Sequence, residues 1–113
     1  MHELALCGAI ADIVARRAGE RPVTAVHVRI GELRQVVPDT LSFCWTMVTQ
    51  DTDLDGARLE VDRVTALLRC RDCGAEHPMP DAISFACAGC GSLAVDVVRG
   101  EEFDITALEL ARV

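Results

Sequence analysis

The sequence lacks several features that would place the protein at a membrane or on a nucleic acid. No window holds 18 consecutive apolar residues, and the N-terminus has no basic segment of the kind that begins a secretory signal peptide. Lysine is absent, and 11 Arg face 18 Asp and Glu, which gives a net charge of -7. Phosphate binding needs a basic surface, so nucleic acid is an unfavourable partner. We therefore expect a cytoplasmic protein that binds neither membrane nor nucleic acid.

Catalytic motifs are also missing. The sequence contains no Tyr, aromatic residues make up 4% of it, and no phosphate-binding loop (G-x-x-x-x-G-K-S/T), catalytic triad or paired-carboxylate site is recognisable. A chain of 113 residues can bury one modest core but has little surface to spare for a large substrate cavity. We expect a small protein that binds small ligands, metals or other proteins.

Two segments show the periodicity of amphipathic helices. Over residues 3–18, apolar side chains recur every three or four positions, and Gly19 can end the helix. A second helix is expected after Pro38, with its apolar face formed by Leu41, Cys44, Trp45 and Val48. Cys7 and Cys44 lie on these apolar faces, so we interpret them as buried small hydrophobes.

Three further segments alternate apolar and polar residues, as half-buried strands do: residues 24–30, 58–64 and 102–110. Between the second and third of these, from Arg69 onward, no periodicity is long enough to build a core of its own. The last segment changes phase near its end, which is typical of a bulged strand.

These elements predict an α+β fold class. It is a two-layer α/β arrangement of two helices on a three-stranded sheet, with a four-cysteine domain inserted late in the chain. The predicted boundaries are residues 1–66 plus 96–113 for the α/β domain and residues 67–95 for the insert.

Two C-x-x-C pairs separated by 13 residues form the strongest motif: Cys70 with Cys73, and Cys87 with Cys90. Two thiolates at this spacing can occupy adjacent corners of a tetrahedron, so two pairs complete a closed four-sulfur zinc site. Because such a site has no open position, the zinc is expected to be structural. It would replace the core that a short insert lacks. Redox-active or merely buried thiols, and a rubredoxin-like iron site, remain alternatives.

The first three residues can also bind a metal. The α-amino group of Met1, the deprotonated amide nitrogen of His2 and the His2 imidazole can form two fused chelate rings. Three coplanar nitrogens suit Ni(II) or Cu(II) better than Zn(II). The alternative is that His2 is a solvated terminal residue and that Glu3 complements the dipole of the first helix.

Three stretches together resemble the HypA/HybF family of nickel-insertion accessory proteins for NiFe-hydrogenase. They are the N-terminal MHEL, the sequence VRIGEL at residues 28–33, and the late C-x-x-C pairs. The resemblance runs over essentially the whole chain and implies a nickel-binding α/β domain with a zinc domain inserted late. It implies that Met1 and His2 bind nickel and that Glu3 supports this site and partner recognition. The zinc ligands that it implies are Cys70, Cys73, Cys87 and Cys90.

The resemblance also implies a function. The protein would be a metallochaperone and not an enzyme. It would receive Ni(II) together with the GTPase HypB and deliver it to the immature hydrogenase large subunit. Nucleotide hydrolysis would belong to the partner, because this chain has no phosphate-binding loop. Urease maturation proteins stay open as further partners, and the size suits either a monomer or a weak homodimer.

This sequence departs from part of the family at one point. Gly74 and Gly91 stand where some members carry a His after each C-x-x-C pair, so we expect no variation of the zinc ligands here. His77, four residues beyond Cys73, is interpreted as an exposed loop residue, with an auxiliary metal ligand as the alternative. His27 is interpreted as a solvated residue. Two other functions remain alternatives, namely a zinc-ribbon protein-interaction module without nickel transfer and a small iron electron carrier.

Overall fold

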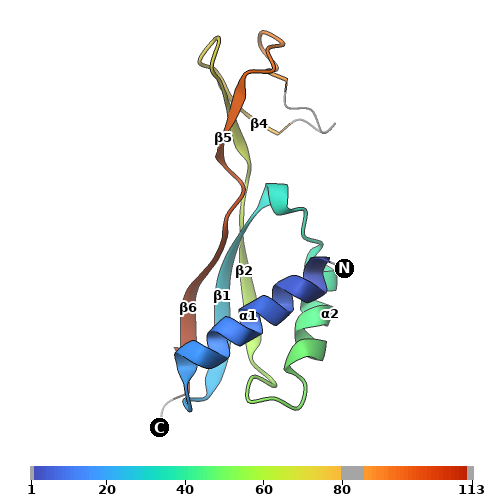
Figure 1. Cartoon of the computed structure of the whole chain (residues 1–113), viewed down its shortest axis with the longest axis vertical. Coiled ribbons are helices and arrows are strands. Elements are labelled where there is room, and N and C mark those ends of the chain that lie inside the picture. Colours follow the sequence, from blue (N-terminus) through green and yellow to red (C-terminus); the bar gives the residue numbers. More distant parts are fainter. Residues whose placement is uncertain (1, 80–85, 112–113) are drawn as a thin grey trace. The chain divides into compact units, whose positions relative to one another are not determined.

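The computed structural model describes residues 2–79 and 86–111. The chain divides into two compact units: the described parts of residues 1–29, 36–62 and 104–113, and those of residues 30–35 and 63–103. In chain order the elements are α1 (His2–Ala18), β1 (Val23–Gly31), the 3-10 turn η1 (Glu32–Arg34), α2 (Pro38–Thr49), β2 (Arg58–Val64), β3 (Leu67–Cys70), β4 (Glu76–Pro78), β5 (Val95–Arg99) and β6 (Phe103–Leu110) (Figure 1).

The two helices of the first unit form where the apolar spacing predicts them. α1 buries completely the side chains of Cys7, Ile10 and Val14. It ends before Gly19, whose φ of +61° favours glycine. α2 begins at Pro38, a position where no backbone N–H is needed. The helices pack against each other, and the Cys7 thiol donates a hydrogen bond to the Leu41 carbonyl at 3.4 Å. No helix in the described residues is long and apolar enough to cross a bilayer.

The first sheet has the order β2-β1-β6, so β1 is its central strand (Figure 1). Val26, Val28 and Ile30 of β1 are buried, as the alternation predicts. Trp45 of α2 is 4% exposed, and its indole N–H donates to the Ala57 carbonyl at 2.9 Å, which makes it an anchor of the core. The predicted α+β class, with two helices and these three strands, is confirmed.

A second sheet lies in the second unit, where the sequence predicts no regular core. Its order is β4-β3-β5, and both strand pairs are antiparallel. Ala66 and Leu68 are 1% and 0% exposed, so this part of the chain does bury apolar residues. Both residues come before Arg69, where the irregular stretch is predicted to begin. The three strands themselves were not predicted, because they span only three to five residues, too few for alternation to stand out in the sequence.

Two residues of the VRIGEL sequence, Gly31 and Glu32, have a structural role within this second unit. The Gly31 N–H donates to the Glu102 carbonyl at 2.8 Å, and a Cβ added to Gly31 would lie 2.0 Å from the Gly100 carbonyl oxygen. Only glycine permits so close an approach of two backbones. The next residue, Glu32, accepts a hydrogen bond from the Ala66 N–H at 2.8 Å. These two residues therefore tie together segments that are distant in the sequence.

Candidate metal centre

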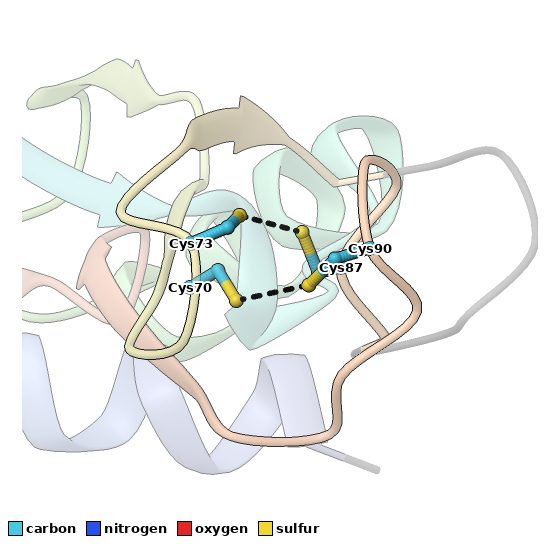
Figure 2. A group of neighbouring side chains, drawn as sticks. All are labelled: Cys70, Cys73, Cys87 and Cys90. Carbon is cyan, nitrogen blue, oxygen red and sulfur yellow. Dashed lines mark hydrogen bonds between the residues drawn. The ribbon is translucent and has the colours of Figure 1, made fainter.

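The four cysteines of the C-x-x-C pairs converge on one point. Their sulfur atoms all lie within 4.8 Å of one another, and the Cys70–Cys90 and Cys73–Cys87 sulfur pairs are each 3.6 Å apart. Figure 2 shows the four side chains directed toward each other. A tetrahedral site with metal–sulfur bonds of about 2.3 Å has sulfur–sulfur edges of about 3.8 Å. The cluster therefore has the dimensions of a closed four-thiolate metal site.

Each C-x-x-C pair lies in a turn with the same backbone hydrogen bonds. In the first, the Gly74 N–H donates to the Cys70 carbonyl and the Cys70 N–H donates to the Ala75 carbonyl, both at 2.9 Å. The second repeats this pattern at 2.8 Å, Gly91 to Cys87 and Cys87 to Ser92. The two glycines have φ values of +76° and +75°, a backbone region that residues with a side chain rarely adopt. Glycine after each pair is thus required by the turn.

Contacts between the two turns hold the pairs in place. The Ser92 hydroxyl donates to the Asp72 carboxylate, and the Arg71 N–H donates to the Ala94 carbonyl at 2.8 Å. Cys70 and Cys87 are buried, whereas Cys73 and Cys90 are exposed. One face of the cluster is therefore packed against protein and the other is open to solvent.

Backbone N–H groups around the cluster stabilise thiolates. The pKa of Cys87 is lowered to about 6 because the N–H groups of Cys90 and Gly89 donate to its sulfur. The pKa of Cys70 is likewise lowered, first by the N–H of Cys73 and then by that of Asp72. At Cys90 the Ser92 N–H lowers the pKa, but the neighbouring sulfurs outweigh it and raise the pKa to about 12. Four thiolates this close repel one another, so all four sulfurs can be ionised at once only if a bound cation offsets their charge. A dication would do this.

The first residues lie at a different place in the fold. His2 is the first residue of α1 and is exposed, and Met1 lies outside the described residues. The carboxylate of Glu3 accepts a hydrogen bond from the Val37 N–H at 3.0 Å, at the start of α2. This bond is the main reason why the pKa of Glu3 is lowered, and its own N–H adds to the effect. The start of α1 is thus fastened to the start of α2.

The remaining histidines and cysteines differ in part from expectation. His77 is half-buried on β4, opposite Leu68, and its Nε2 has no partner among the described residues, so the loop interpretation was wrong. His27 is hydrogen-bonded to the Glu109 carboxylate at 2.6 Å rather than simply solvated. Cys7 is buried as expected, and burial raises the pKa of its thiol to about 11.

Sequence reasoning missed three residues around these sites. Ser92 and Asp72 join the two turns. The short polar side chains inside the first pair and two residues after the second pair could have suggested this contact. Val37 offered no signal, because its partner Glu3 is 34 positions away and the bond uses only the backbone N–H of Val37.

The comparison with known proteins agrees with this arrangement. A family model described as "Hydrogenase/urease nickel incorporation, metallochaperone, hypA" matches residues 1–110. The chain belongs to the HypA family. The hydrogenase maturation factor HypA of Geotalea uraniireducens is 47% identical over 110 residues, which are 97% of this chain and 99% of that protein. HypA of Nostoc sp. is 37% identical over 113 residues, which are 100% of this chain and 98% of that protein.

Solved HypA structures share the fold. The solution structure of the Ni metallochaperone HypA from Helicobacter pylori superimposes with a TM-score of 0.66 at 19% identity, over 97% of each chain. A second solution structure of a HypA protein gives a TM-score of 0.60 at 19% identity and covers 96% of this chain and 92% of that one. The HypA family is one of metallochaperones, and the four-cysteine cluster gives this member a site suited to a metal ion.

Proposed function

We propose that this HypA-family protein is a cytoplasmic nickel carrier rather than an enzyme. It binds Ni(II) at its N-terminus and delivers it to the large subunit of NiFe-hydrogenase during maturation. The observation that carries the proposal is the match of a nickel-incorporation family over residues 1–110. The proposed partners are the GTPase HypB, which would supply the nucleotide hydrolysis, and the immature large subunit. Urease maturation proteins remain open as further partners, and the oligomeric state is either a monomer or a weak homodimer.

The proposed nickel ligands are the α-amino group of Met1 and the amide and imidazole nitrogens of His2. The first N–H groups of a helix have no intrahelical acceptor, so the His2 amide at the start of α1 can be deprotonated without loss of a helix bond. Glu3 supports the site from the next position because its bond to Val37 limits how far the start of α1 can move. Exposure of His2 suits a carrier, since a bound ion must also be able to leave.

The proposed metal at Cys70, Cys73, Cys87 and Cys90 is structural zinc. The site is closed by four sulfurs, and two of them are buried, so it offers no position for a substrate. The thiolate tetrahedron alone also suits iron. Purified protein that is colourless and contains zinc would support the zinc assignment, whereas visible absorption from a ferric thiolate centre would overturn it.

The function is tested by a transfer experiment. Protein loaded with radioactive Ni(II) is mixed with purified immature large subunit, HypB and GTP, and nickel in the large subunit is then counted. We expect transfer by the wild type and by His27→Ala, and loss of transfer by His2→Ala. If His2→Ala binds the same partners and transfers nickel equally well, the terminal site is wrong. If the wild type binds the partners without transferring nickel, the protein is an interaction module with a zinc ribbon.

A further inference from the structure

The strand β6 forms an open edge of the first sheet. It lies outside β1 in the order β2-β1-β6, and no further strand pairs with it among the described residues (Figure 1). An edge strand presents a row of free backbone N–H and C=O groups to which another chain can pair. Proteins usually block such edges with proline, with charged side chains, or with a bulge that twists the edge away.

The two edges of this sheet differ in how they are protected. The opposite edge, β2, carries four charged side chains among its seven residues. β6 has no Pro, Lys or Arg over its eight residues, and residues 105–108 are uncharged. Its two carboxylates are already paired across the sheet, Asp104 with Arg29 and Glu109 with His27. β2 also pairs two of its charges, Arg58 with Glu60, but its Asp62 and Arg63 have no ion pair among the described residues. The edge of β2 therefore keeps unpaired charged side chains that the edge of β6 lacks.

A groove runs alongside this open edge. It has a volume of about 410 Å³ and is lined by Ile13, Val14 and Arg17 of α1 and by residues 105–108 of β6. Val14 is fully buried, whereas Ile13 is 39% exposed and so has apolar surface available for contact. The groove is thus lined mainly by apolar side chains and lies next to free backbone hydrogen-bonding groups.

A positive charge lies in the same groove. Arg17 is exposed and has no ion pair or side-chain hydrogen bond within the part of the chain that the structure describes. The same is true of Arg16 and Arg21, which lie on or just beyond the last turn of α1. The chain as a whole carries a net charge of -7, so unpaired arginines next to the groove are a local positive charge on an acidic molecule. A ligand with a carboxylate would complement it.

We propose that β6 and this groove bind an extended segment of a partner protein. The segment adds to the sheet as a fourth strand, places an apolar side chain against Ile13 and brings a carboxylate to Arg17. Strand addition of this kind takes its affinity from main-chain hydrogen bonds and its specificity from pockets for alternate side chains. A second copy of this chain fits less well, because the carboxylates of its own β6 are already paired. The surface acts independently of nickel binding.

The test uses the full chain with its metal and a displayed library of random 12-residue peptides. Peptides that bind the wild type are retained after removal of those that bind Ile13→Asp. We expect enriched peptides that alternate apolar residues and carry a carboxylate. We also expect them to slow amide hydrogen exchange at residues 105–108, and to bind Arg17→Glu about tenfold more weakly, a loss of about 1.4 kcal/mol.

Two variants make the same chemical changes elsewhere and serve as controls. Met47→Asp alters an apolar side chain of α2 that is 51% exposed, and Arg63→Glu reverses a charge on β2. Both are expected to bind the enriched peptides like the wild type. The proposal is overturned by failure to enrich any peptide, by equal binding to Arg17→Glu, or by protection from exchange on β2 instead. A dimer that Ile13→Asp dissociates would also overturn it, since the occupant would then be a second copy.

Discussion

The carboxylate of Glu3 accepts a hydrogen bond from the backbone N–H of Val37 at 3.0 Å. This contact joins the first turn of α1 to the residue that precedes α2, across 34 positions of sequence. The N–H groups at the start of a helix have no intrahelical acceptor, so Glu3 satisfies a donor that would otherwise depend on water. The residue next to the proposed nickel ligands is therefore part of the framework of the fold.

The Glu3–Val37 bond predicts a specific dependence of stability on pH. The folded protein lowers the pKa of Glu3 from its ordinary value of 4.5, mainly through the Val37 N–H. A carboxyl group with a depressed pKa stabilises the fold above its unfolded pKa, and this contribution is lost as the pH falls through the folded pKa. We expect Glu3→Gln to lower the denaturation midpoint at pH 6 and the difference from wild type to shrink below pH 4.5.

The denaturation midpoints of wild type and Glu3→Gln are measured in urea between pH 6 and pH 3. Glu20→Gln is the matched control, because Glu20 is exposed and has no side-chain partner among the described residues. A midpoint difference between Glu3→Gln and wild type that is the same at every pH would contradict the assigned role of the carboxylate.

We predict that a variant lacking one of the four cysteines loses the bound metal and the ordered structure of the two turns that hold it. Cys73→Ser leaves three sulfurs, and structural zinc in small peptides contributes roughly 10 to 16 kcal/mol of apparent binding energy at neutral pH. We expect the bound metal to fall from about one per chain to almost none, because a closed site needs all four ligands. Cys44→Ser, which alters a buried cysteine of α2, should keep the metal. Metal analysis after dialysis checks both, and full metal retention by Cys73→Ser would contradict the four-ligand site.

Substitution of glycine by alanine is expected to change the free energy of unfolding in opposite directions at Gly31 and Gly8. In Gly31→Ala the new Cβ would lie 2.0 Å from the Gly100 carbonyl oxygen, so one backbone must move. We expect a loss of at least about 1–3 kcal/mol of unfolding free energy. In Gly8→Ala, within α1, nothing lies within 4 Å of the new Cβ, and the higher helix propensity of alanine should add roughly 0.5–1 kcal/mol. Denaturant titration measures both, and a stable Gly31→Ala would contradict the close backbone approach.

The elements that could be predicted are those with long regular patterns. α1 and α2 span 17 and 12 residues, and β1 and β6 span nine and eight, so their apolar spacing is visible in the sequence. The strands β3, β4 and β5 were missed because three to five residues do not establish a period. His77 was misplaced for the same reason, since it belongs to the three-residue strand β4.

Of the candidate sites too, only the part built from local sequence motifs could be predicted. The four-cysteine cluster was predictable because each C-x-x-C-G turn is local, and two such turns need only meet. The Glu3–Val37 bond was not, because nothing in the spacing of two residues 34 positions apart indicates contact. The ligation of nickel by Met1 and His2, and the domain boundaries at residues 67 and 95, stay predictions.

The most direct test of the nickel-carrier account is a calorimetric titration of untagged protein with Ni(II). Wild type is compared with His2→Ala, with a form that has one extra Gly before Met1, and with His27→Ala as the control. We predict that the wild type and His27→Ala bind nickel, whereas His2→Ala and the extended form do not, with the metal at the four cysteines retained throughout. Nickel binding that is unchanged in both N-terminal variants would contradict the account.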